Sequence, residues 1–440
     1  MTRADTLSRD ILRLAVPALG ALVAEPLFLI VDAALVGHLG VVPLAALGLA
    51  SAVLQTIVGL MVFLAYSTTP SVARRVGAGD PSGAVRAGID GMWLALGLGL
   101  ALAIAGFLAT PFVVGLFGAG PDVARDAETY LAISMWGLPA MLLVFAATGL
   151  LRGMQDTVTP LWIAGTGFGL NALLNLAFIY GLGWGIAGSA AGTVVAQWGM
   201  VAAYAIVVGR LARRHAASVG PRAAGLGGSA RSGGWMFLRT VSLRAALLAT
   251  VAVATTLGAP ELAGWQIVFT IFSTAAFALD ALSIAAQALV GKSIGAADLE
   301  TARHVLRRMI AWGAWFGAIV GVVVGGLSGV IGLLFTGDAA LAAMIQPALL
   351  VLAVAQPLCG VVFVLDGVLI GANDGRYLAI TGGLNLVPFV PCLLVLALLH
   401  PAGAAGLAGL SVAFFGVYML ARIATLGWRI RGSAWLHRPA

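Results

Sequence analysis

Twelve long apolar segments, separated by short connections, occupy almost the whole chain. They are placed at 12–38, 44–70, 87–110, 128–151, 159–181, 186–209, 238–257, 262–290, 306–335, 341–370, 377–399 and 402–428. Each is long enough for an α-helix that crosses a bilayer, which takes about 20 residues. Because 61% of the residues are apolar and only 9% are charged, a water-soluble globule is excluded. The sequence predicts an all-α integral membrane protein with twelve transmembrane helices.

The basic residues lie on alternate connections, as at Arg74, Arg152, Lys292 and Arg376, whereas the opposite connections hold only Arg125. The positive-inside rule therefore predicts that both termini are cytoplasmic. The net charge of +7 is spread between apolar segments without a basic, aromatic surface, so it indicates topology and not nucleic-acid binding.

The two halves of the chain match at a single offset of 218 residues. The motif "GLLRGMQD" at Gly149 pairs with "GVLIGAND" at Gly367, and "GIAGSA" at Gly185 pairs with "GAAGLA" at Gly403. Because a unit of six helices crosses the membrane an even number of times, both copies enter the membrane from the same side. We expect two parallel-repeat six-helix bundles around a central cleft.

The predicted lobes comprise residues 1–209 and 237–440. Between them, residues 210–236 are rich in Gly, Ser and Arg, which predicts a flexible cytoplasmic linker.

Motifs that both copies share are expected to serve the scaffold. Glycines at small-xxx-small spacing allow helices to approach closely, and aspartates in cytoplasmic turns cap helices. The glycines are Gly149, Gly153, Gly367 and Gly371, and the aspartates are Asp80, Asp156, Asp298 and Asp374.

Four acids within apolar segments have no acidic counterpart in the other copy: Glu25, Asp32, Asp280 and Asp366. A charge near the bilayer centre costs about 2.5 to 3.5 kcal/mol on insertion scales. No Lys or Arg is expected at mid-depth to pair with these acids, so each either carries a proton for much of the time or holds an external cation. We therefore predict that these acids bind a proton or another cation.

Depth in the membrane links Asp32 to other polar residues. Asp32 lies six residues before the outer end of its helix, or about 9 Å at 1.5 Å per residue. Asn175 and Thr193 reach a similar depth, and Asn171 lies one turn from Asn175 on the same helix face. These four residues form the predicted cation-coupling site, with interhelical hydrogen bonding as the alternative role for the amides and the hydroxyl.

The first helix carries two further features. Glu25 lies two turns from Asp32 on the same face, and Pro17 and Pro26 each remove a backbone hydrogen bond. A helix that bends when its acids are protonated is one interpretation, and a static kink is the other. Asp280 and Asp366 are candidates for a site in the second lobe.

Enzymatic chemistry has little support. Cys359 and Cys392 lie in apolar segments with no disulfide or zinc spacing, and the His residues form no metal pair. We predict no enzyme activity, no cofactor beyond the coupling ion and no certain metal site.

The motifs "VDAALVGHLG", "GLLRGMQDTVTP" and "GIAGSAAGTVVAQ" resemble the multidrug and toxic compound extrusion (MATE) family. "AFALDALSIAAQALVGKSIGA" and "FVLDGVLIGA" resemble its DinF-like branch, and the resemblance covers essentially the whole chain. It implies a cation-coupled exporter of lipophilic, usually cationic compounds in the plasma (cell inner) membrane. The coupling carboxylate of that branch falls on Asp32, its amide pair on Asn171 and Asn175, and its hydroxyl on Thr193.

Two departures from the family pattern bear on the coupling ion. Some relatives have an acid where this chain has Asn175, and another branch has a sodium-site acid at a position aligned with Cys359. We therefore predict a monomeric antiporter that exchanges drugs for inward protons, with sodium as the alternative ion at Asp32, Asn171, Asn175 and Thr193. A flippase for lipid-linked precursors is the alternative function, but its anionic substrate would require Lys or Arg in the cleft.

Overall fold

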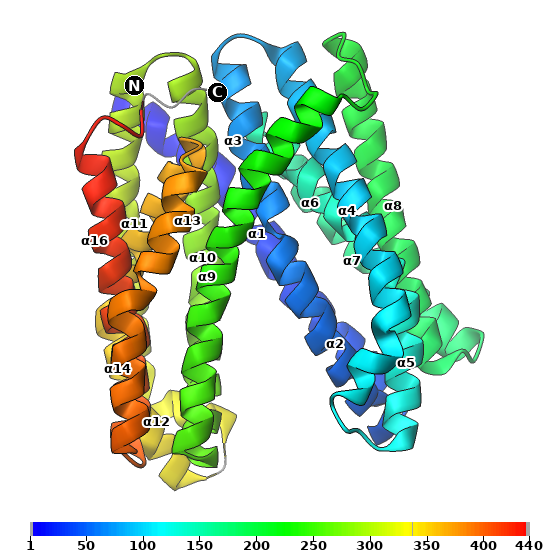
Figure 1. Ribbon diagram of the computed structural model, residues 1–440, viewed down its shortest axis with the longest axis vertical. Helices are drawn as coiled ribbons and strands as arrows, with labels where there is room; N and C mark the ends of the chain where they lie inside the picture. Colours follow the sequence, from blue (N-terminus) through cyan, green and yellow to red (C-terminus); the bar gives the residue numbers. More distant parts are fainter. Residues whose placement is uncertain (1–2, 337, 437–440) are drawn as a thin grey trace. The chain divides into compact units, whose positions relative to one another are not determined.

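The computed structural model describes residues 3–336 and 338–436 (Figure 1), and all regular secondary structure in these ranges is helical. The first half contains α1 Arg3–Gly37, α2 Val41–Met61, α3 Phe63–Gly77, α4 Pro81–Gly115, α5 Pro121–Met135, α6 Leu138–Gly153, α7 Val158–Leu176, the π-helix η1 Ala177–Gly181 and α8 Gly185–Arg214. The second half contains α9 Ala223–Leu257, α10 Ala259–Gly295, α11 Leu299–Phe335, α12 Ala339–Gly371, α13 Gly375–Leu384, α14 Leu386–Leu399, α15 Ala404–Ser411, the π-helix η2 Val412–Tyr418 and α16 Met419–Arg431.

Within the described residues, eleven helical spans are long and apolar enough to cross a membrane, and the pair α5 and α6 makes a twelfth if it is one bent span. Every predicted segment coincides with one of these spans. The bend of 46° between α5 and α6 falls at Trp136 and Gly137, directly before Pro139 near the start of α6. Since proline lacks an N–H group, a break is favoured just before it.

The chain forms two compact units. One comprises Val16–Gly233, and the other comprises Met1–Ala15 with Gly234–Ala440. The start of α1 belongs to the second unit, where Arg308 on α11 donates a hydrogen bond of 2.9 Å to Ser8 Oγ.

Backbone geometry recurs at the offset of 218 residues that the sequence predicts. Gly40 and Gly258 have φ values of 132° and 146°, and Gln155 and Asn373 have φ values of 67° and 57°. A positive φ is uncommon, above all for a residue other than glycine. The internal repeat is therefore present in the structure as well as in the sequence.

The first glycine pair packs α6 against α3. A Cβ atom at Gly149 would lie 2.9 Å from the carbonyl oxygen of Ala65, and one at Gly153 would lie 2.7 Å from that of Thr69. Contacts this short leave no room for a side chain, so the predicted packing role is confirmed for this pair.

The second pair makes the equivalent contact between α12 and α10. A Cβ atom at Gly367 would lie 2.5 Å from the carbonyl oxygen of Ser283, and one at Gly371 would lie 2.6 Å from that of Gln287. Ser283 and Gln287 follow Ala65 and Thr69 by 218 positions, so both units use the same helix contact.

The repeated aspartates behave as predicted at three positions. Asp80 and Asp298 accept hydrogen bonds of 2.7 and 2.9 Å from the backbone N–H groups of Gly83 and Thr301 at helix N-termini. Asp156 accepts from the N–H groups of residues 158 and 159. Asp374 precedes α13 and forms an ion pair of 2.5 Å with Arg429.

The predicted flexible linker is largely helical, which corrects the sequence-based expectation for residues 210–236. Helix α8 continues to Arg214 and α9 already begins at Ala223, which leaves eight residues between them. A Cβ atom at Gly225 would lie 2.0 Å from the Asp90 carboxyl group. One of the glycines that suggested flexibility, Gly225, thus allows α9 to approach α4 closely.

Candidate functional site

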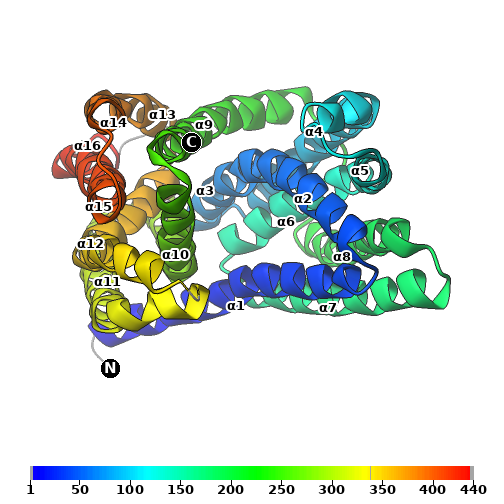
Figure 2. The ribbon, with the colours of Figure 1, turned by 90° about the horizontal axis from the view of Figure 1, so that it is seen from below.

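Helix α1 is held against α7 and η1 at three points within the Val16–Gly233 unit. The rings of Phe28 and Phe168 stack with centroids 5.1 Å apart, and the Tyr180 hydroxyl donates a hydrogen bond of 2.7 Å to the carbonyl oxygen of Leu35. Asp32 makes the third contact, described below. Figure 2 shows α1 and α7 running side by side.

The Asp32 carboxyl group receives two side-chain hydrogen bonds on one oxygen. Asn175 Nδ2 donates to Oδ1 at 2.7 Å, and Ser189 Oγ donates to the same atom at 2.8 Å. The residue is 4% exposed. Hydrogen bonds to an ionised group are stronger than neutral ones, so this arrangement suits a carboxylate that is cut off from water.

The hydrogen bonds continue beyond Asp32 through the other predicted residues. Asn175 Nδ2 also donates to Asn171 Oδ1 at 3.2 Å, and Asn171 Nδ2 donates to Thr193 Oγ1 at 2.9 Å. The structure therefore joins Asp32, Asn175, Asn171 and Thr193 in one chain of hydrogen bonds across α1, α7 and α8. We name this chain of residues, with Ser189, the Asp32 cluster.

Sequence reasoning missed Ser189 and Tyr130. Ser189 lies four residues before Thr193 on α8, so the helical spacing that linked Asn171 with Asn175 would also have selected it. Tyr130 on α5 lies close to Asp32 and Ser189. No feature of the Tyr130 sequence context distinguishes it from an aromatic residue of the core.

One acceptor in the Asp32 cluster has no partner. Asn175 Oδ1 is buried and makes no hydrogen bond in the described structure. It faces Gly192 on α8, where a Cβ atom would lie 2.2 Å away. The absence of a side chain at Gly192 lets α8 approach α7 closely enough for Asn171 to reach Thr193.

Some oxygens of the Asp32 cluster are engaged in hydrogen bonds within the protein. Asp32 Oδ1, Asn171 Oδ1 and Thr193 Oγ1 each already accept hydrogen bonds. Within the described residues no group of three or more His, Cys, Asp or Glu residues is arranged to hold a metal. A hard cation such as Ca²⁺ takes six to eight oxygen ligands.

The other predicted features of the first helix precede Asp32 along α1. Helix α1 runs without interruption through Pro17 and Pro26. Glu25 is exposed on α1. The bending of this helix and the role of Glu25 stay predictions.

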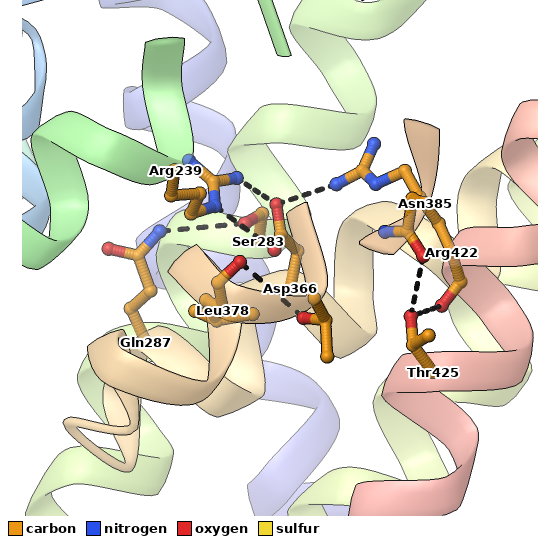
Figure 3. Close-up of polar contacts among 9 residues, drawn as sticks. Arg239, Ser283, Gln287, Asp366, Leu378, Asn385, Arg422 and Thr425 are labelled. Carbon is orange, nitrogen blue, oxygen red and sulfur yellow. Dashed lines mark hydrogen bonds and ion pairs between the residues drawn. The ribbon is translucent and has the colours of Figure 1, made fainter. Parts of the chain in front are cut away.

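Asp366 does not match its sequence-based interpretation as an acid without a basic partner. Its carboxyl group on α12 lies between the guanidinium groups of Arg239 on α9 and Arg422 on α16 (Figure 3), both of which form ion pairs with it. The Arg422 pair measures 2.9 Å, and the side chains of all three residues are 9% exposed. Basic residues are common at cytoplasmic helix ends, so the sequence pattern by itself predicts that both arginines lie at the membrane surface. Their helices instead place them inside the unit, where a carboxylate offsets the cost of burial.

The other second-lobe candidate, Asp280, is half-buried on α10. Its role in a site stays a prediction.

The carboxyl and amide groups of the Asp32 cluster have no equivalent in the second copy. The positions 218 residues after Asp32, Asn171 and Asn175 hold Thr250, Phe389 and Leu393. The Thr250 hydroxyl donates to the carbonyl oxygen of Ala246 on its own helix, and Phe389 packs against Phe414 and Tyr418. The buried carboxyl site is thus a property of one unit, as expected of a site that the scaffold itself does not require.

Comparison with known proteins gives matches over the whole chain. The family model described as MatE matches residues 17–177 and 237–394. Protein DETOXIFICATION 44, chloroplastic, of Arabidopsis thaliana is 31% identical over 96% of this chain and 82% of its own length. The "Probable multidrug resistance protein NorM" of Pseudomonas putida is 32% identical over 70% of this chain and 68% of its own length.

A solved structure has the same fold. The MATE transporter VcmN of Vibrio cholerae, in its bent form, superposes with a TM-score of 0.89 at 20% identity, with 100% of both chains covered. Because the family model and two relatives above 30% identity agree with the helical architecture, this chain belongs to the MATE family of multi-pass membrane transporters and is not an enzyme.

Proposed function

We propose that this protein exports lipophilic, mostly cationic compounds in exchange for inward-moving protons by alternating access. The observation that carries the proposal is the buried Asp32 carboxyl group, which links α1 to α7 and α8 through Asn175 and Ser189. A titratable group at a junction of three helices connects proton binding to helix packing.

Protonation would change the hydrogen bonds at this junction. A proton on Asp32 removes the negative charge of its carboxylate form, so the hydrogen bonds from Asn175 and Ser189 become weaker. Helix α1 carries Pro17 and Pro26, and each proline leaves a gap in the backbone hydrogen bonds of the helix. Bending of α1 away from α7 and α8 is the proposed response, and release of the proton to the cytoplasm restores the hydrogen bonds.

The pH gradient supplies the energy when one proton exchanges for one monovalent cation, because the two charges cross in opposite directions and cancel. With an uncharged compound the charge of the proton is not cancelled, and one charge that moves inward through 100 mV releases about 2.3 kcal/mol. This energy corresponds to about a fiftyfold concentration ratio of that compound, since each 1.4 kcal/mol is a factor of ten.

The state of the oxygens favours a proton over sodium. Three oxygens of the Asp32 cluster accept hydrogen bonds, and the buried Asn175 Oδ1 has no partner within the described residues. A proton needs only one oxygen of Asp32, whereas sodium needs a shell of several.

The proposed substrates follow from the relatives and from charge. The Pseudomonas putida relative carries the name of a multidrug resistance protein. A protonated Asp32 is uncharged and no longer attracts a cation, so protonation favours release of a cationic compound. This supports lipophilic cations as the exported class. We propose a monomer in the plasma membrane with both termini cytoplasmic, supported by basic residues on alternate connections.

The test is gradient-driven efflux of a fluorescent lipophilic cation from proteoliposomes that contain the wild type, Asp32→Asn or Asp122→Asn. Asp122 is exposed at the start of α5, so its variant controls for the loss of one carboxylate elsewhere. We expect a pH gradient to drive efflux in the wild type and in Asp122→Asn, with at least a tenfold lower rate in Asp32→Asn. Full activity of Asp32→Asn would overturn the mechanism, and efflux driven by a sodium gradient alone would replace the proton with sodium.

A further inference from the structure

The internal repeat provides a neutral reference for the Asp366 site. Thr148 and Tyr204 precede Asp366 and Arg422 by 218 positions. In the first unit their hydroxyl groups share a hydrogen bond of 2.8 Å. An uncharged pair therefore suffices to join these two helices of the scaffold.

The second unit has charges at the same place. Arg239 and Arg422 share the single carboxyl group of Asp366, whereas the position equivalent to Arg239 holds Ala21. Charged groups inside a membrane protein are expensive and commonly mark functional sites. Because the repeat folds without them in its first copy, the charges call for an explanation other than the fold.

Tyr418 provides an independent observation at this place. It is 1% exposed, and its hydroxyl group has no hydrogen-bond partner in the described structure. It lies one turn before Arg422, on the π-helix η2, and within electrostatic range of Arg422, Arg239 and Asp366. Buried polar groups are nearly always hydrogen-bonded, so the unpartnered hydroxyl of Tyr418, four residues before Arg422, indicates a missing partner.

Arg422 also has donors to spare. Within the described part of the chain, its guanidinium group donates a hydrogen bond to Asp366 through Nη2. Figure 3 shows the other terminal nitrogen of Arg422 pointing away from Asp366. A guanidinium nitrogen and a tyrosine hydroxyl are both donors, so the partner that would satisfy them is an acceptor.

We propose that the second unit contains a binding site for a small organic carboxylate, held by the Arg422 guanidinium group and the Tyr418 hydroxyl group. The planar guanidinium group matches a carboxylate in shape, and the Asp366 carboxyl group already uses one edge of it. The rings of Phe389 and Phe414 lie 5.1 and 5.6 Å from the Tyr418 ring, which gives the site an apolar side. An aromatic carboxylate such as benzoate therefore fits the chemistry better than a hydrated inorganic anion.

The experiment is equilibrium binding of radiolabelled benzoate to the full-length protein in lipid nanodiscs, with acetate and chloride as competitors. Tyr418→Phe removes only the unpartnered hydroxyl, so its thermal stability without ligand should equal that of the wild type. Tyr204→Phe is the matched control, because Tyr204 is a buried tyrosine of the other unit. We expect saturable binding in the wild type and in Tyr204→Phe, about tenfold weaker binding in Tyr418→Phe, and displacement by acetate at lower concentrations than by chloride.

A second variant replaces the charged site with its neutral counterpart from the first unit: Arg239→Ala, Asp366→Thr and Arg422→Tyr together. This variant should fold and bind no benzoate. Unchanged binding in Tyr418→Phe or in the triple variant, or chloride competing as well as acetate, would overturn the proposal. Asp32→Asn should retain benzoate binding while it loses efflux, so the carboxylate site and the proposed transport mechanism can fail separately.

Discussion

Asn175 donates a hydrogen bond of 2.7 Å to Asp32 although 143 positions separate the two residues. This bond joins α7 to α1, and Asn175 is completely buried. The second copy has Leu393 at the position equivalent to Asn175, so a leucine is compatible with the scaffold there.

Asn175→Leu is expected to lower proton-driven efflux at least tenfold and to leave the amount of folded protein nearly unchanged. The variant removes a donor to the Asp32 carboxylate, and hydrogen bonds to charged groups contribute about 1.5 to 3 kcal/mol. Efflux from proteoliposomes measures the first effect, and size-exclusion chromatography measures the second. Wild-type efflux in this variant would show that Asn175 has no part in coupling.

Gly192→Ala should disrupt the Asp32 cluster. Its Cβ atom would lie 2.2 Å from Asn175 Oδ1 and 3.1 Å from the Asn175 backbone nitrogen. We expect destabilisation by about 1 to 3 kcal/mol, as for overpacked cores, together with loss of efflux. Gly199→Ala on the same helix is the control, because its Cβ atom would meet only a Leu170 side chain at 3.5 Å. Equal thermal stability of the two variants would contradict the packing argument.

Asp366→Asn should destabilise the second unit by about 3 to 5 kcal/mol, because it leaves Arg239 and Arg422 buried without their carboxylate. The triple variant with the neutral residues of the first unit should recover most of that loss. Thermal unfolding in one detergent compares the two proteins. A triple variant less stable than Asp366→Asn would show that the charged groups are part of the scaffold after all.

Gly371→Ala tests the helix contact that both units share. The added Cβ atom would lie 2.6 Å from the carbonyl oxygen of Gln287, and backbone atoms cannot move aside as a side chain can. We expect about 1 to 3 kcal/mol of destabilisation. Gly326→Ala on α11 has nothing within 4 Å of its Cβ atom and should be neutral or stabilising by up to about 1 kcal/mol. Thermal unfolding distinguishes these outcomes.

The segment between the lobes can be tested by hydrogen exchange. Gly227 and Gly228 are exposed on α9 and have open space around them. Replacing both with Ala should slow amide exchange near the start of α9, because Ala favours a helix over Gly by about 1 kcal/mol per residue. Gly225→Ala should speed exchange, since its Cβ atom would meet the Asp90 carboxyl group. A flexible linker would exchange at the same fast rate in all three proteins.

The sequence by itself determined the membrane spans, the internal repeat and the partners of Asp32 among the predicted residues. Segment length and apolar content decide which stretches cross a bilayer, since both depend only on the local chain. Asn171, Asn175 and Thr193 were found because helical rise converts sequence position into depth, and residues at one depth can meet if their faces agree.

Only the tertiary structure decided which faces meet. Ser189 and Tyr130 lie close to Asp32. Arg239 and Arg422 form ion pairs with Asp366. These residues are far apart in sequence, and the rotation and packing of the helices bring them together. The same limit explains the linker, where composition predicts flexibility but α9 already begins at Ala223 and Gly225 lies close to the Asp90 carboxyl group. The depth of a residue in the membrane follows from its position along its own helix, whereas its contacts with other helices depend on how whole helices pack.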